Sequence, residues 1–452
     1  MSKNTKIIED DFLGSEKISR ILLKLAPPVM LAQLIQALYN IVDSFFVGRY
    51  SNDALTALSV IYPLQLIIIA LAVGTGVGVN TYMAGKYAQK RTDDADNAAG
   101  TGMVLEFATW FVFAIISYLI MKPYVMASAK TPDAVSSAVT YGNIVCIGSI
   151  GAFLEGNFTK VHQSHGNMRL PMIAQICGAI INIVLDPVLI FGVGPFPEMG
   201  VDGAAAATVC GQIAAAVITG ISGYRRPPKL NRLFHYIKRI YFYGYSSILM
   251  QALYTVYIVV LNIILAGFSD AAVTVLGLYY KMQTFFFIPL FGLQTCIVPV
   301  ISFNYVRKSY KRCKDIMKSS FSVSTLFMII GVIAFVFMPS HIIRLFSDSA
   351  EVLSIGAIAF PVIGLSFIPA VFSLMIPVFF QAIGKGKESL FLSVARQIFC
   401  LIPIFWGFSM IGLDYTWIAF PASEIISGGI GIFMYLRTIG GWEKISDHNR
   451  KC

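Results

Sequence analysis

Long apolar segments recur along the whole 452-residue sequence and are separated by short polar connections. There are twelve, at about 22–48, 56–84, 98–121, 137–157, 169–193, 200–222, 242–268, 272–302, 318–340, 353–382, 389–411 and 414–437. Each is long enough to cross the hydrocarbon core of a bilayer, which takes about 20 helical residues. With 56% apolar and 13% charged residues, the sequence predicts an all-α integral membrane protein and does not fit a soluble one.

The basic residues gather in alternate connections between these segments. The even-numbered connections are rich in Lys and Arg, most of all the one at 223–240, whereas the odd-numbered ones carry mostly acids or few charges. By the positive-inside rule, both termini are expected in the cytoplasm of a multi-pass cell-membrane protein, with 1–21 as a cytoplasmic N-terminal segment and 439–452 as a cytoplasmic tail. The net charge of +10 is thereby explained by topology, and we expect no nucleic-acid partner because no basic face forms.

The two halves of the sequence repeat one another at a single constant offset, the one that aligns Gln33 with Gln251. Further matches at this offset are Tyr39 with Tyr257, Gln65 with Gln283, Gly74 with Gly292, Tyr87 with Tyr305 and Lys90 with Lys308. Six spans per half is an even number, so both halves enter the membrane in the same orientation and form a parallel repeat. We predict two six-helix lobes, at 22–222 and 241–438, joined by a cytoplasmic linker at 223–240.

Two acids of the first half, Asp43 and Asp186, stand beside other polar residues inside an apolar segment. Asp43 is preceded at helical spacing by Asn40, Gln36 and Gln33, and Asp186 follows Asn182 by one helical turn. Buried membrane acids normally face protein, water or a cation. The repeat partners of Asp43, Asn182 and Asp186 are Leu261, Cys400 and Ile404. This asymmetry indicates that the three polar residues form one site in the first lobe.

Such a site suits a coupling ion. Repulsion between two carboxylates in one apolar cavity favours proton binding by one of them, while carboxylate, amide and hydroxyl oxygens also suit a small monovalent cation. The sequence leaves proton and sodium equally open. Duplicated bundles of this kind usually work by alternating access, so transport is the default inference, and a scaffolding or receptor role is the alternative.

Several motifs resemble those of the multidrug and toxic compound extrusion (MATE) family. They are YNIVDSFFVGR, GNFTKVHQSHGNMRLPM, NIVLDPVLIFG, GVDGAAAAT and QAIGKGK, and they are most similar to the DinF-like and MepA-like bacterial branch. The resemblance implies a V-shaped pair of lobes and export of cationic or amphiphilic compounds driven by proton or sodium influx. By motif, Asp43, Asn182 and Asp186 match the N-lobe cation site, and Thr208 is its hydroxyl member. In another branch, acids on helices 7 and 10 bind sodium, but helix 7 here has Gln251 and helix 10 has no acid.

The substrate is expected to meet polar and aromatic residues on helices 1, 4 and 7. These are Gln33, Gln36, Tyr39, Asn40, Asn157, Gln251, Tyr254 and Tyr257, with stacking and cation–π contact from the tyrosines. Among the other charged residues, Glu106 and Lys281 are assigned to span ends, Arg396 is expected to anchor to headgroups or a loop, and Glu155 is a candidate for the cytoplasmic mouth.

We predict an antiporter that needs no cofactor, no metal beyond the coupling ion and no partner chain. The sequence contains no GxxxxGK[ST], HExxH or GxSxG motif, which argues against ATP-driven transport and hydrolase activity. One alternative is a flippase for lipid-linked precursors, which would require cavity-facing arginines. The other alternative is an integral-membrane enzyme. Such an enzyme would need a cluster of His or Asp residues, which the sequence does not show.

Overall fold

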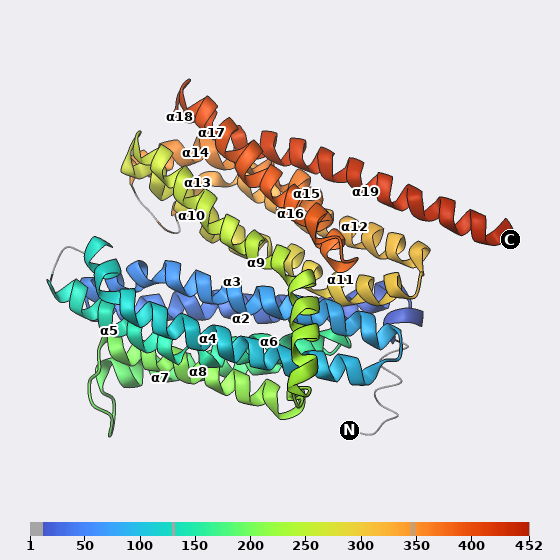
Figure 1. Cartoon of the computed structure of the whole chain (residues 1–452). Coiled ribbons are helices and arrows are strands. Elements are labelled where there is room, and N and C mark those ends of the chain that lie inside the picture. Colours follow the sequence, from blue (N-terminus) through green and yellow to red (C-terminus); the bar gives the residue numbers. More distant parts are fainter. Residues whose placement is uncertain (1–11, 129–131, 345, 347–348, 452) are drawn as a thin grey trace. The chain divides into compact units, whose positions relative to one another are not determined.

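The computed structural model describes residues 12–128, 132–344, 346 and 349–451, and this part of the chain is helical without any β-strand (Figure 1). The chain divides into two compact units. Unit 1 contains Pro27–Ile248 and the described residues before Gly14, and unit 2 contains Gly14–Ala26 and the chain from Leu249 onward. The units are therefore divided inside two helices, α2 (Ile18–Tyr50) and α9 (Leu230–Ala266).

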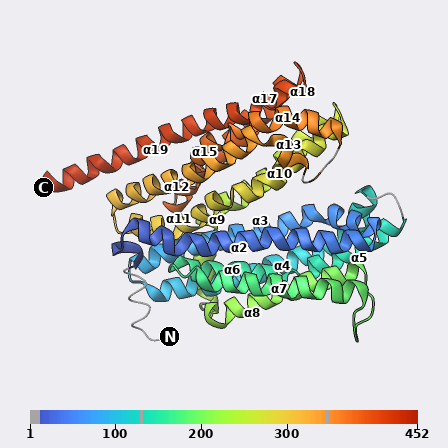
Figure 2. The same ribbon diagram turned by 180° about the vertical axis from the view of Figure 1, so that it is seen from behind.

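The described part of unit 1 contains, besides the start of α9, helices that lie side by side in both views (Figures 1 and 2). They are α2 (Ile18–Tyr50, of which the first turns belong to unit 2), α3 (Asn52–Ala88), α4 (Thr92–Ser128), α5 (Pro132–Gly148), α6 (Ile150–Ser164), α7 (Arg169–Phe191) and α8 (Val201–Gly223). Their small and apolar side chains fill the interior, which includes Ala57, Ile61, Tyr141 and Phe153.

Unit 2 continues from α9 with shorter and more often broken helices. They are α10 (Asp270–Phe286), α11 (Ile288–Val306), α12 (Tyr310–Phe337), α13 (Pro339–Arg344), α14 (Ala350–Gly364), α15 (Phe367–Ala382), α16 (Gly386–Val394), the π-helix η1 (Ala395–Leu401), α17 (Ile402–Ser409), α18 (Leu413–Thr416) and α19 (Ala419–Lys451). Phenylalanines such as Phe335, Phe360 and Phe367 pack ring against ring in its core.

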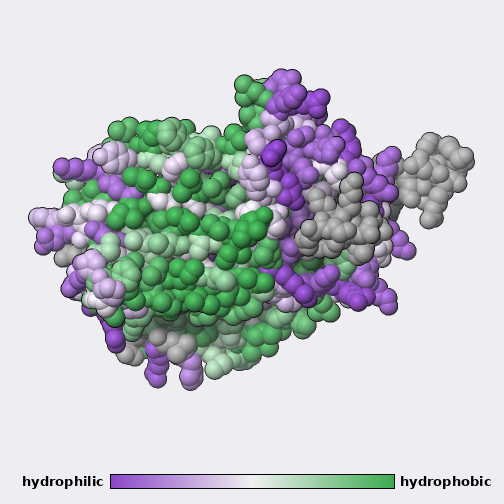
Figure 3. All heavy atoms as spheres, turned by 90° about the horizontal axis from the view of Figure 1, so that it is seen from below, coloured by the Kyte–Doolittle hydropathy of each residue, from purple (hydrophilic) through white to green (hydrophobic). Residues whose placement is uncertain are grey.

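The twelve predicted membrane segments all fall on these helices. In the described part of the chain, eleven helical stretches are long and apolar enough to cross a membrane, and the pair α14 and α15, bent by 54°, supplies a twelfth. The predicted span 272–302 is interrupted at Phe287, before Pro289 in the first turn of α11, because proline lacks the N–H that would continue the preceding helix. The surface over α7 and α8 carries a broad hydrophobic belt bordered by hydrophilic residues, as expected for helices that cross a membrane (Figure 3).

The internal repeat is visible in the local backbone of each unit. The repeat partners Ser51 and Ser269 both cap a helix by accepting a hydrogen bond from the backbone N–H three positions further along the chain. Gly166 and Gly384, which are also repeat partners, both adopt positive φ, at 84° and 78°. The repeat predicted from residue identities therefore extends to helix caps and turns.

Candidate functional site

The tight approach of α7 and α8 begins at the turn that joins them. Gly192 ends α7 in the left-handed region, and Gly200, also at positive φ, precedes α8. A Cβ at Gly192 would lie 2.6 Å from the backbone nitrogen of Glu198, so only glycine fits this turn. Backbone bonds from Met199 N–H to Leu189 C=O and from Gly200 N–H to Ile190 C=O fix the register of the two helices.

Small residues keep the two helices in contact deeper in unit 1. A Cβ at Gly178 on α7 would lie 2.7 Å from the carbonyl oxygen of Gly211 on α8, and a Cβ at Gly211 would lie 2.6 Å from that of Gly178. This backbone contact brings Asn182 close to α8. Its amide Nδ2 donates to Thr208 Oγ1 at 3.4 Å and to Asp186 Oδ1 at 3.4 Å.

Helix α2 places Asp43 beside this pair of helices. Val47, one turn after Asp43, is fully buried in a cluster with Ile190 and Val201, and the ring of Tyr50 meets that of Phe191 at 6.2 Å. Asp43 lies one helical turn before Val47 on α2, and Asp186 lies one turn before Ile190 on α7. The two carboxyl groups lie near enough to interact electrostatically.

The four residues predicted as a cation site therefore lie together in unit 1. Asp186 is fully buried, and Asp43, Asn182 and Thr208 are at most 9% exposed. Within the described residues, Asp43 Oδ1, Asn182 Oδ1 and Asp186 Oδ2 are buried and have no hydrogen-bond donor. Buried acceptors normally have a donor, so three oxygens without one suit a proton or a small cation that prefers oxygen ligands.

Two residues that the sequence analysis did not identify border this site. Tyr141 on α5 is 1% exposed, interacts electrostatically with Asp43 and Asp186, and its hydroxyl accepts from Gln65 Nε2 on α3 at 3.4 Å. The repeat partner of Tyr141 is Ala359. Like Asp43, Tyr141 therefore has an apolar repeat partner, and this asymmetry could have identified it from the sequence.

The predicted substrate residues are divided between the two units. In unit 1, Gln36 is exposed, Gln33 and Tyr39 are half-buried, and Tyr39 interacts electrostatically with both acids. The side chain of Asn40 lies outside the described part of the structure. Asn157 is 1% exposed and donates to Ala99 C=O on α4 at 3.4 Å, so it packs between α4 and α6.

The remaining predicted substrate residues belong to unit 2. Gln251 and Tyr254 are half-buried on α9, whereas Tyr257 is 2% exposed. The rings of Tyr254 and Tyr257 meet at 5.4 Å, and both approach Tyr280 on α10, at 6.4 and 6.3 Å. These residues form an aromatic cluster, and their contact with substrate stays a prediction.

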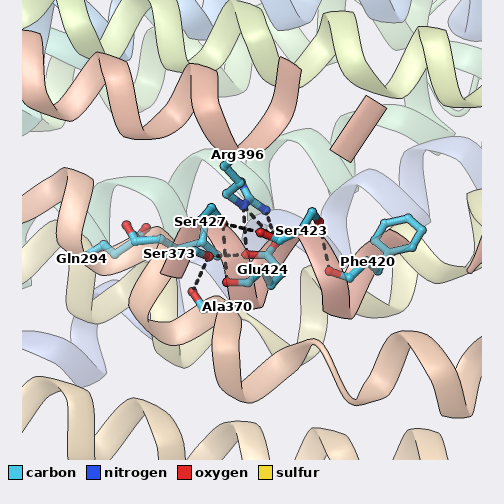
Figure 4. A network of polar contacts seen from close by, with 9 residues as sticks. Gln294, Ala370, Ser373, Arg396, Phe420, Ser423, Glu424 and Ser427 are labelled. Atoms are coloured by element: carbon cyan, nitrogen blue, oxygen red, sulfur yellow. Dashed lines mark hydrogen bonds and ion pairs between the residues drawn. The ribbon is translucent and has the colours of Figure 1, made fainter. Parts of the chain in front are cut away.

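Unit 2 also contains a buried ion pair, which corrects the expectation for Arg396. Its Nε lies 2.9 and 3.1 Å from the two carboxylate oxygens of Glu424, and its Nη2 lies 2.8 Å from Oε1. The Ser373 hydroxyl donates to the same carboxylate (Figure 4). The expected headgroup anchor was wrong because Arg396 is only 9% exposed inside the π-helix η1 and finds its partner on α19.

Glu106 requires a second correction. It was assigned to a span end, but it lies about four helical turns after Thr92, the first residue of α4, and is fully buried. The position of Glu106 along the apolar segment does not show which helices cover its side chain, so it gave no sign of this burial. Neither of its carboxylate oxygens has a hydrogen-bond partner among the described residues.

No group of three or more His, Cys, Asp or Glu side chains suited to a metal ion occurs in the described part of the chain. The site around Asp43 differs from such a cluster because it combines two carboxylates with an amide and a hydroxyl group. Its composition suits a proton or a weakly held monovalent cation better than a divalent transition metal.

Comparison with known proteins agrees with this architecture. A probable multidrug resistance protein NorM of Thermotoga maritima is 26% identical, with 96% of each chain covered. A protein named FAD transporter of Shewanella oneidensis is 23% identical over 92% of this chain and 94% of its own length. The solved structure of a MOP superfamily transporter from Pyrococcus furiosus, 21% identical, superposes with a TM-score of 0.88 over 96% of this chain and 98% of that one.

The MatE family model matches the chain twice, at residues 28–188 and 246–406. The two matches have equal length, and their starting positions are repeat partners, so the family model follows the internal repeat. Members of this family are membrane transporters rather than enzymes. The chain belongs to the MatE family of multi-pass membrane transporters.

Proposed function

We propose that the chain is an antiporter that exports cationic or amphiphilic compounds in exchange for protons or sodium ions. The observation that carries the proposal is the site of Asp43, Asn182, Asp186 and Thr208, in which three buried oxygens have no donor among the described residues. An ion that binds there neutralises the repulsion between Asp43 and Asp186. Its release restores the repulsion, so occupancy of the site changes the stability of the helix packing around it.

The driving force is sufficient for such exchange. One positive charge that moves inward through 100 mV releases about 2.3 kcal/mol. That free energy supports a substrate gradient of roughly fifty-fold per charge. The names of relatives support multidrug export, and another relative's name gives FAD as a compound to include among the substrates tested.

The flippase alternative receives no support from the arginine inside unit 2. A flippase for lipid-linked precursors needs positive charge that faces the substrate. Arg396 is buried and neutralised by Glu424, so it presents no free positive charge to a phosphate.

The test is transport in proteoliposomes with imposed gradients. Export of the fluorescent cation ethidium is measured under a proton gradient and, separately, under a sodium gradient, with FAD as a competitor. The variants are Asp43→Asn and Asp186→Asn, and Asp93→Asn at an exposed position of α4 is the matched control.

We expect gradient-driven export in the wild type and in Asp93→Asn, and its loss in both site variants. The gradient that works identifies the coupling ion. Normal export by both site variants would show that the carboxylates are structural and would overturn the proposal. Gradient-driven export of FAD itself, measured in the same proteoliposomes, together with absence of ethidium export would replace the cationic substrate class with an anionic one.

A further inference from the structure

A third buried acid of unit 1, Glu106 on α4, lies outside the site of Asp43 and Asp186. On α4, Ala99, Gly102 and Glu106 follow one another at spacings of three and four residues and therefore share one face. Ala99 contacts Asn157 of α6 through its carbonyl oxygen. Further along the same helix, Phe113 meets Phe153 of α6 at a ring distance of 6.2 Å. Glu106 lies between these two contacts and so faces α6.

Gly102 leaves room for a polar contact next to Glu106. A Cβ at Gly102 would overlap Asn157 Oδ1, so the amide oxygen occupies the space that a side chain would fill. Helical side chains lean toward the N-terminal end of their helix. The carboxyl group of Glu106, one turn after Gly102, therefore leans toward the Asn157 amide.

Three buried acceptor atoms on α4 and α6 lack a donor. They are both carboxylate oxygens of Glu106 and Oδ1 of Asn157, each buried and without a partner among the described residues. Rotating the amide of Asn157 does not resolve this, because its Nδ2 already donates to Ala99 C=O, and the rotation would set two acceptors against each other. A single proton on Glu106, shared with Asn157 Oδ1, supplies the missing donor.

No charged side chain among the described residues pairs with Glu106. Within the described side chains, the titratable groups on the helices packed against α4 are Tyr62, Tyr82, Lys86 and Tyr87 (α3), Asp133, Tyr141 and Cys146 (α5), and Glu155, Lys160 and His162 (α6). None of these donates a hydrogen bond to Glu106 within the described residues. Glu155, the acid of α6, accepts a hydrogen bond from the Thr159 hydroxyl. An ionised Glu106 would thus be a buried charge without a partner.

We propose that Glu106 and Asn157 form a second proton-binding site of unit 1, separate from Asp43, Asn182, Asp186 and Thr208. The proton is held as long as α4 and α6 stay packed. Separation of the two helices admits water, ionises Glu106 and releases the proton. A role of this site in coupling rests on the proposed antiport, whereas proton binding by Glu106 does not.

Infrared spectroscopy of the purified protein in liposomes tests the site without any transport assay. The Asp43→Asn/Asp186→Asn background removes the acids of the first site. In that background, Glu106→Gln is compared with the parent, and Glu155→Gln serves as the matched control. Glu106→Gln keeps a donor toward Asn157 and should fold, because its amide N–H replaces the acid O–H.

We expect a carbonyl band of a protonated carboxylic acid at neutral pH that is lost in Glu106→Gln and kept in Glu155→Gln. Asn157→Leu should shift this band to the frequency of an acid without a hydrogen bond. Absence of the band from the parent would overturn proton binding by Glu106. A band that Asn157→Leu leaves unshifted would overturn the shared site.

The coupling role has its own readout in proteoliposomes. If protons drive export, Glu106→Gln should retain ethidium exchange without a gradient but lose at least half of the accumulation driven by a proton gradient. Unchanged accumulation would overturn the coupling role. If the wild type exports no ethidium at all while the infrared band is present, the proposed antiport of ethidium fails and the proton-binding site stands.

Discussion

Lys90 and Lys308 are partners in the internal repeat, and each adopts a left-handed backbone with φ of 58°. They are the two non-glycine residues with positive φ in the described part of the chain. Each N–H donates to the carbonyl three positions earlier, Tyr87 and Tyr305, at 2.9 Å. Both units therefore end a long helix with the same strained turn, followed by a new helix.

Replacing either lysine by glycine should stabilise the protein. A non-glycine residue in the left-handed region costs about 1–2 kcal/mol, and glycine removes most of that cost. We expect Lys90→Gly and Lys308→Gly each to raise the thermal unfolding midpoint of the detergent-solubilised protein. Lys86→Gly, in the last turn of α3, should lower it, because glycine weakens a helix. Equal destabilisation by all three variants would contradict this account of the turn.

The repeat and the membrane segments were predictable because both follow from local patterns. Apolar length identifies a span, and the constant offset between the halves aligns residues whose side chains occupy equivalent turns. Asp43 and Asp186 were predictable for a related reason. An acid in an apolar helix conflicts with its surroundings, and the absence of an acid at Leu261 and Ile404 marks the site as specific to one half.

Lateral packing was not predictable from these patterns. Arg396 lies in the π-helix η1, whereas its partner Glu424 lies on α19. Hydropathy reports how apolar a span is but not which helix lies beside it. For the same reason, the sequence placed Glu106 near a span end and did not reveal that it lies on the face of α4 that packs against α6.

The contact between α7 and α8 predicts that Gly211→Ala disturbs the candidate site. Its new Cβ would lie 2.6 Å from Gly178 C=O and 3.3 Å from the Asn182 Cβ. Overpacking of this kind costs about 1–3 kcal/mol, and it would push Asn182 away from Thr208. We expect lower thermal stability together with weaker gradient-driven export. Gly277→Ala is the control, because a Cβ there meets no atom within 4 Å. Wild-type behaviour of Gly211→Ala would mean that the two helices have room to separate.

The hydroxyl of Thr208 is predicted to matter more than its methyl group. Thr208→Ser keeps the acceptor for Asn182 Nδ2, whereas Thr208→Val keeps the shape and loses the acceptor. A hydrogen bond contributes about 0.5–1.5 kcal/mol, so the affinity for the coupling ion should fall about two- to tenfold in Thr208→Val. The measurement is the concentration of coupling ion that half-saturates export. Similar loss in both variants would indicate that packing by the methyl group, not the hydroxyl, holds the site.

The ion pair of Arg396 and Glu424 is predicted to act as one unit in the stability of unit 2. Removing one partner leaves a buried charge without compensation, which costs about 3–5 kcal/mol. We therefore expect Arg396→Met and Glu424→Leu to lower the thermal midpoint strongly. Replacing a buried pair by apolar residues is often close to neutral, so the double variant should recover most of that loss. Ser373→Ala removes only the hydroxyl that donates to Glu424 and should cost about 1 kcal/mol. A double variant destabilised by the sum of the single effects would show that the two side chains stabilise unit 2 independently, through contacts other than their mutual pair.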